Sequence, residues 1–131
     1  MSVECRIVVG VTIDLYETEL SHEDFDMIHK FIEAHPELDE YNYRYDEREG
    51  KPLLIYDGMN GDFARLVWPD KIIEPGMLGE GNEFIESYIP SPMSDPDIGT
   101  KITTLVELYE EFTGEPCGRE RVKYAMWSQW F

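Results

Sequence analysis

The chain has 131 residues, of which 42% are hydrophobic, and its 28 acidic and 11 basic residues give a formal net charge of −17. The apolar content suits a packed globule and excludes a disordered chain. No apolar run approaches the roughly 20 residues that a membrane helix needs. A chain this negative repels nucleic acid and anionic membranes and favours basic partners.

Residues 1–131 are expected to form one α+β domain. The fold expected is a mainly antiparallel sheet of four to five strands, made of a long N-terminal strand plus a three-stranded meander, with two or three helices packed on it. The N-terminus lacks the pattern of a secretory signal, and two cysteines are too few for a disulfide framework. We therefore expect a cytoplasmic protein.

The N-terminal stretch 4–16 alternates between apolar and other residues. Cys5, Ile7, Val9, Val11, Ile13 and Leu15 share one parity, and Val8 is the only aliphatic residue on the other. A period of two held this long is typical of a strand. The pattern predicts that one face of the strand packs on the core and that the other face is mostly exposed to solvent.

A helix is predicted to start after Ser21, because Ser21 and Asp24 have the spacing of a capping box. Phe25, Ile28 and Ile32, with Phe31 beside them, form its inward stripe. Pro36 ends it near Ala34 or His35.

Three strands of a meander are predicted next. The first carries Tyr41, Tyr43 and Tyr45 on one parity, the second is 53–56, and the third runs from Phe63 to Trp68 and extends towards Ile73. The turn between the last two contains the Asn60-Gly61 pair that favours hairpins.

The second half of the chain begins with a glycine-rich loop, 74–82, and a short strand, 84–89. A helix then starts at Pro96 or after Thr100, and Gly114 stops it. One face of that helix is apolar, formed by Ile98, Ile102, Leu105, Tyr109 and Phe112. The last segment, 119–131, fits both a helix and a strand, and the helix is preferred.

The sequence offers weak support for catalysis or metal binding. His22, Asp26, His29 and Glu33 share one helix stripe, but one helix supplies only part of a metal site. Cys117 lies near Arg119 and Arg121, which could lower its pKa, yet no histidine is near in sequence to act as a base. No catalytic residue, metal or cofactor is predicted, and a role other than an enzyme is favoured.

The charge is uneven along the chain. The segment 14–49 holds thirteen acids and three bases, and the sign reverses only at Arg119, Arg121 and Lys123. In being small, acidic and without a catalytic signature, the chain resembles the inhibitor class that includes toxin-immunity proteins and phage anti-defence proteins. The resemblance implies a binding role, in which carboxylates stand where a nucleic acid presents phosphates and occupy a basic surface of another protein.

The residues predicted to make that contact are acids and tyrosines. The charge contacts are Asp46, Glu47, Glu49, Glu110 and Glu111, and the anchors are Tyr43 and Tyr45. Two alternatives stay open. One is an enzyme or ligand-binding domain with a site near the Gly76–Gly81 loop. The other is a homo-oligomeric structural component joined through Trp127, Trp130 and Phe131, which would form an apolar patch if exposed.

Overall fold

One antiparallel sheet of four strands and two α-helices form the α+β fold that the sequence predicts. The computed structural model describes residues 5–16, 20–44, 47–56, 63–73 and 96–130. The strands follow the order β2-β3-β1-β4 in the sheet. Their bounds are Cys5–Asp14 for β1, Leu53–Tyr56 for β2, Ala64–Ile73 for β3 and Val122–Trp130 for β4.

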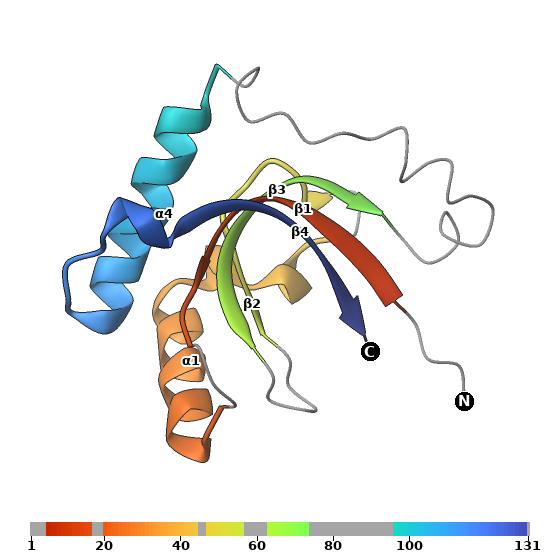
Figure 1. Ribbon diagram of the computed structural model, residues 1–131. Helices are drawn as coiled ribbons and strands as arrows, with labels where there is room; N and C mark the ends of the chain where they lie inside the picture. Colours follow the sequence, from red (N-terminus) through yellow and green to blue (C-terminus); the bar gives the residue numbers. More distant parts are fainter. Residues whose placement is uncertain (1–4, 17–19, 45–46, 57–62, 74–95, 131) are drawn as a thin grey trace, which may run out of the picture.

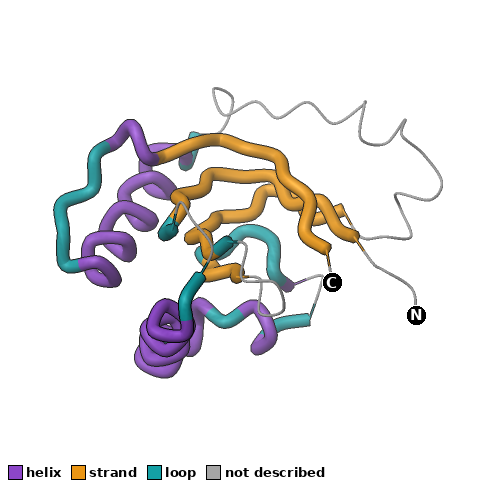
Figure 2. Tube along the Cα trace, turned by 60° about the horizontal axis from the view of Figure 1, so that its bottom comes forward, coloured by secondary structure: helices purple, strands orange, loops and turns teal. Residues whose placement is uncertain are grey.

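The helices are α1, His22–Ala34, and α4, Ile98–Thr113. Figures 1 and 2 show the strands as one curved layer with both helices gathered at its left. No helix within the described ranges is long and apolar enough to cross a membrane.

Strand β1 lies in the middle of the sheet and is buried on both faces. Val9, Val11 and Ile13 are buried on the parity that the sequence assigns to the core. Val8 and Thr12, on the opposite parity, are 0% and 4% exposed. The expectation of a mostly wet second face is therefore wrong, because the chain places a second apolar layer there.

The sheet separates two apolar clusters. The cluster on the helix side joins Val11 and Ile13 of β1 to Ile28 of α1 and to Leu105 and Phe112 of α4. The cluster on the other face consists of Val8, Leu53, Ile55, Val67 and Ile72, with Tyr43, Phe63 and Trp127 packed against it. Thr12 is accommodated there because its hydroxyl donates to the carbonyl oxygen of Leu66 at 3.2 Å.

Helix α1 begins where the capping pattern predicts. The Ser21 hydroxyl accepts from the amide of Asp24 at 3.2 Å, and the Asp24 carboxylate accepts from the amide of Ser21 at 2.8 Å. The helix ends at Ala34, before Pro36. Its inward stripe is also confirmed, since Ile28 is fully buried and Phe25, Phe31 and Ile32 pack on the same cluster.

Helix α4 also follows its pattern. It starts after Asp97 and buries Leu105, Tyr109 and Phe112. It ends at Gly114, whose φ of 72° lies in the left-handed region that glycine reaches without strain.

The predicted strand is wrong over Tyr41 and Tyr43, and its third tyrosine, Tyr45, lies outside the described residues. Two short 3₁₀ turns, η1 (Pro36–Leu38) and η2 (Glu40–Asn42), occupy this part of the chain. Asp39 favours the turn because its carboxylate accepts from the amide of Tyr41 at 3.0 Å. The segment crosses the edge of β2, where Asp39 forms an isolated parallel bridge with Leu54.

The preference for a C-terminal helix is also wrong. A short 3₁₀ turn, η5 (Arg119–Arg121), leads into β4, which pairs with β1 from Val122 to Trp130. The physical reason is the free edge of β1, whose backbone donors and acceptors on that side are satisfied by a second antiparallel neighbour. The predicted Asn60-Gly61 turn, the Gly76–Gly81 loop and the strand 84–89 lie outside the described residues.

Gly10 gives a direct test of the register between β1 and β3. The register shifts between Val9 and Gly10, and a Cβ at Gly10 would collide with the carbonyl oxygen of Trp68. We expect Gly10→Ala to lower the free energy of unfolding by about 2 kcal/mol, because the obstacle is backbone and cannot rotate away.

Gly99 provides the matched control. It lies in the first turn of α4, and apart from its chain neighbours and the backbone of its own helix no described atom lies within 4 Å of its Cβ position. Gly99→Ala should raise the free energy of unfolding by about 0.5 kcal/mol. Urea unfolding of the two variants measures both values, and equal effects would contradict this account of Gly10.

Candidate functional site

The two helices and their flanking turns carry a strongly acidic outer surface. Among the described residues there, nine carboxylates are exposed against one exposed base, Lys30. We call this surface the acidic helical layer; its members are Glu23, Asp26, Glu33, Glu37, Asp97, Glu107, Glu110, Glu111 and Glu115. The other base of the two helices, Lys101, is ion-paired with Asp70 of β3 at 2.8 Å. The outward potential of this side is therefore set by carboxylates.

The helices meet at their C-terminal ends. The rings of Phe31 and Phe112 lie edge to face with centroids 5.1 Å apart. Beside them, His35 Nε2 lies 2.8 Å from Glu111 Oε1, and His35 Nδ1 lies 3.3 Å from Glu37 Oε1. Aromatic packing and polar contacts thus fix the two helices against each other.

A groove of about 330 Å³ runs across this junction. Its floor is apolar, and Met27 in it is 48% exposed. The apolar residues that line it are Met27, Phe31, Ala34 and Phe112, and the polar ones are Lys30, His35 and Glu111. An apolar floor within an acidic surround has the composition of an interface centre with a polar rim.

The structure places the predicted contact residues in two separate regions. Glu110 and Glu111 belong to the acidic helical layer, at the C-terminal end of α4. Glu47 is exposed, whereas the Glu49 carboxylate accepts from the amide of Ile72 in β3 at 2.8 Å. Glu49 therefore holds its own segment to the sheet.

Tyr43 is half-buried against the cluster on the second face of the sheet. Its hydroxyl donates to the carbonyl oxygen of Glu37 at 2.8 Å, and the ammonium of Lys51 lies 3.9 Å from the centre of its ring. Asp46 and Tyr45, the other predicted contacts, lie outside the described residues.

The aromatic C-terminus is only partly described. Trp127 packs its ring against the second cluster of its own chain, and its indole nitrogen is buried with no hydrogen-bond partner among the described residues. Phe131 and the side chain of Trp130 are not described.

The histidine stripe of α1 and Cys117 have ordinary contacts. His29 Nε2 lies 3.2 Å from the hydroxyl of Tyr56. Within the described ranges, no three histidine, cysteine or acidic side chains are grouped as a metal ion would need.

Burial and the nearby Glu110 raise the pKa of the Cys117 thiol, and Arg121 lowers it by less, so the thiol lacks the activation of a nucleophile.

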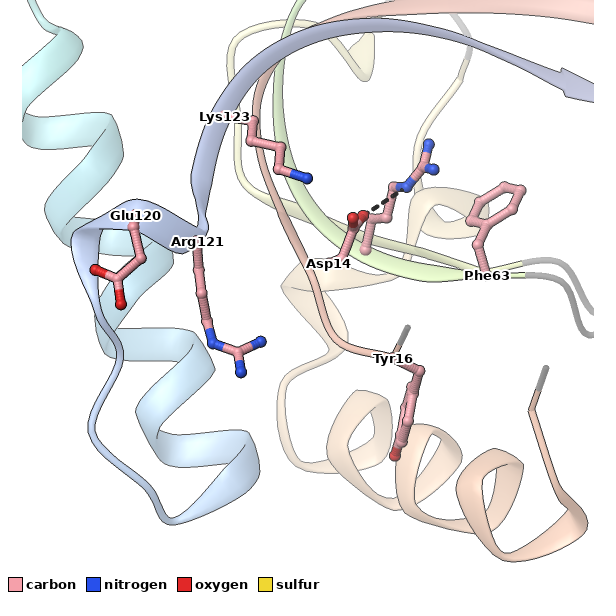
Figure 3. Close-up of a pocket in the computed structure, with 7 residues that line it drawn as sticks. Asp14, Tyr16, Phe63, Glu120, Arg121 and Lys123 are labelled. Atoms are coloured by element: carbon pink, nitrogen blue, oxygen red, sulfur yellow. Dashed lines mark hydrogen bonds and ion pairs between the residues drawn. The ribbon is translucent and has the colours of Figure 1, made fainter. Parts of the chain in front are cut away.

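A second region, which the sequence reasoning missed, is a pocket of about 540 Å³ at one end of the sheet (Figure 3). It contains three of the chain's eleven bases, Arg65, Arg121 and Lys123. The reversal of charge at 119–123 was visible in the sequence. The contribution of Arg65 was not, because it depends on how β3 pairs with β1.

Strand register brings these side chains to one face. Asp14 of β1 is paired with Arg65 of β3, and Thr12 of β1 with Lys123 of β4. Alternate residues of a strand share a face, so Asp14, Arg65 and Lys123 lie with Thr12 on the side away from the helices. Arg121 precedes β4 and also lines the pocket, with its guanidinium 5.5 Å from the ring centre of Tyr109 of α4 and turned away from Lys123 (Figure 3).

Arg65 is held in place by three contacts. Its Nε donates to the Asp14 carboxylate at 2.8 Å, and its guanidinium lies 4.8 Å and 4.9 Å from the ring centres of Phe63 and Trp127. Ring contacts and an ion pair together fix the orientation of its planar donors.

Tyr16 closes the pocket on the side of α1 (Figure 3). Its hydroxyl is buried without a hydrogen-bond partner among the described residues. Burial, followed by the charge of Asp24, raises the pKa of Tyr16 above its ordinary value of 10.0. The hydroxyl is therefore a neutral polar group that folding has removed from water.

Comparison with known proteins gave no match to a family model, to a curated protein or to a solved structure.

Tyr16 and Tyr56 form a matched pair for testing buried hydroxyls. Tyr16→Phe removes an unpartnered hydroxyl and should raise the free energy of unfolding at pH 7 by about 1 kcal/mol. Tyr56→Phe removes the contact with His29 and should lower it by about 1 kcal/mol.

The Tyr16→Phe and Tyr56→Phe variants should also lose less stability than the parent chain at high pH. Burial raises the pKa of both tyrosines above 10.0, so the unfolded chain loses these protons first and stability falls as pH rises past 10. Each Phe variant should show a smaller fall between pH 9 and pH 11 in urea unfolding. A fall equal to that of the parent chain would contradict the buried environment of that hydroxyl.

Proposed function

We propose that this chain is a non-enzymatic binding protein whose acidic helical layer occupies a basic surface of another protein. The observation that carries the proposal is the imbalance on α1, α4 and their flanking turns, where the described residues include nine exposed carboxylates and one exposed base, together with an apolar groove where the helices meet. Complementary charge speeds encounter and selects partners, and it contributes less to affinity than the apolar contact at the centre.

The groove gives the charged surface a point of attachment. The exposed Met27 and the rings of Phe31 and Phe112 can receive one apolar or aromatic side chain of the partner. Lysines and arginines around that side chain would face Glu33, Glu110 and Glu111. The partner that fits is therefore a protein with an apolar residue set among basic ones.

Inhibition is the specific form of this function that we propose. Basic surfaces of this kind commonly bind nucleic acid, because phosphates attract lysine and arginine. Glu107, Glu110 and Glu111 are neighbours on α4 at helical spacing and form a dense local group of negative charge. A protein that covers such a surface with carboxylates excludes the nucleic acid.

Matched double substitutions test this assignment. Glu107→Gln/Glu110→Gln removes two charges from the acidic helical layer, and Glu47→Gln/Glu120→Gln removes two exposed charges outside it. Captured proteins are identified by mass spectrometry after elution with a rising salt concentration. We expect basic proteins to be captured by the parent chain, and about ten-fold less by the first variant, but unchanged by the second.

The apolar part of the site is tested by Met27→Ser, which alters an exposed side chain and should leave the fold intact. It should lower capture of the same proteins without changing the salt at which the remainder elutes. Equal loss in both double variants would show general attraction by charge and would contradict a contact at the acidic helical layer. Capture that no variant changes would refute the proposed role of the acidic helical layer.

A further inference from the structure

We propose that β4 is a pairing edge through which two copies of the chain join their sheets into one. The strand order β2-β3-β1-β4 makes β2 and β4 the two edges of the sheet (β4 is dark blue in Figure 1). An edge strand presents backbone donors and acceptors that another strand can satisfy. The contact is made by the edge of the sheet and not by the outer surfaces of the helices, so this inference is independent of the proposed binding of a basic partner.

The β2 edge is protected against pairing. β2 has only four residues, and the chain before it crosses its edge, where Asp39 forms a parallel bridge with Leu54. The ion pair of Glu40 and Arg48, at 3.7 Å, lies in the same crossing segment. A short strand and a covering segment are two of the devices by which proteins prevent unwanted strand addition.

The β4 edge has little protection of this kind. β4 has nine residues, Val122–Trp130, with no proline among them, and it pairs with β1 in one continuous register. In the described part of the chain, no other strand pairs with β4. Of the usual protective devices, β4 has a lysine, Lys123, near its start. A long, regular edge of this kind is suited to pairing with another strand.

The strand is ordered before it pairs. The hydroxyl of Tyr124 donates to the carboxylate of Asp70 in β3 at 2.6 Å, and Trp127 packs against the second apolar cluster. An ordered edge loses less conformational freedom when a partner binds. Met126 lies between these two anchored residues and is 47% exposed. The strand therefore holds a large apolar side chain in a fixed position at the surface.

The charge of β4 favours a second copy of the chain as its partner. Two chains with a net charge of −17 repel each other wherever their acids meet. The sequence has no acid from Arg121 to Trp130, and Lys123 is the only charged residue of β4. Two copies can therefore approach through β4 without placing carboxylates against carboxylates. A basic strand would meet Lys123 there and no carboxylate of β4.

A two-fold axis sets the register of the pairing. Antiparallel pairing of β4 with its own copy over all nine residues places Met126 opposite Met126 of the second copy, and Lys123 opposite Gln129. Each lysine then faces an uncharged amide, and the two exposed thioethers pack against each other. The same register satisfies the backbone of both edges.

The test is sedimentation of the full chain over a range of chain and salt concentrations. We expect a dimer that becomes stronger as salt rises, because salt screens the repulsion between two chains of net charge −17. Hydrogen exchange followed by NMR should show that alternate backbone amides of β4 are protected in the dimer and exchange quickly in the dilute monomer.

Two substitutions that change the charge equally give a matched comparison. Met126→Lys places two ammonium groups opposite each other and removes the methionine contact, so it should weaken dimerisation by about ten-fold. Thr103→Lys makes the same change of charge at an exposed residue of α4 and should leave dimerisation unchanged. Thermal unfolding of each variant verifies that the fold is retained.

Several outcomes would overturn the proposal. A chain that stays monomeric at millimolar concentration in high salt does not pair through β4. Equal weakening by the two variants would place the contact elsewhere. A dimer that salt weakens would assign the contact to carboxylates of the acidic helical layer and bases of the second copy. Protection of every β4 amide in the monomer would show that the chain covers this edge itself.

Discussion

The constraint on which the rest of the structure depends is the burial of β1 on both faces and along both edges. β3 and β4 pair with it on either side, and separate apolar clusters cover its two faces. Its backbone groups are therefore satisfied by strands far away in the sequence. The close approach of β3 at Gly10 is part of this arrangement, because the register shift there places the Trp68 carbonyl oxygen where a side chain would stand. Both candidate binding regions take their positions from this strand.

The parity of β1 also separates the two regions by charge. Val11 and Ile13 point to the side where α1 and α4 pack, so the outer surfaces of those helices become the acidic helical layer. Asp14 lies on the opposite parity and is paired with Arg65, and the same face receives Lys123 from β4. A shift of one residue in either pairing would move these side chains to the other face. The opposite charges of the two regions are thus a consequence of register.

Features encoded by neighbouring residues were predictable from the sequence. The capping box at Ser21, the apolar face of α4 and the glycine stop at Gly114 each depend on residues within one or two helical turns. Features that depend on pairing between distant parts of the chain were not predictable from the sequence. The segment 119–131 fitted both a helix and a strand by pattern, and the helix was preferred, but pairing with the open edge of β1 makes it a strand. Tyr41 and Tyr43 alternated as in a strand, but Asp39 satisfies the local backbone in a 3₁₀ turn instead. The pocket was missed for the same reason, since Asp14 and Arg65 are 51 residues apart.

The outer faces of the helices are acidic because bases that could neutralise their carboxylates are instead paired with acids in or beside the sheet. Among the described residues, ion pairs in or beside the sheet join Arg48 to Glu40 at 3.7 Å, Arg65 to Asp14, and Lys101 to Asp70. Glu40 is 2% and Arg48 6% exposed, and a buried charge is tolerated only with a partner. Arg48 also reaches the carbonyl oxygen of Tyr43, so this pair holds the turn segment at the edge of β2. Lys101 is the only base of α4, and its pairing with Asp70 leaves Glu107, Glu110 and Glu111 without a base on their own helix. These paired bases therefore hold segments to the sheet, and the exposed carboxylates leave the outer surface of the helices negative.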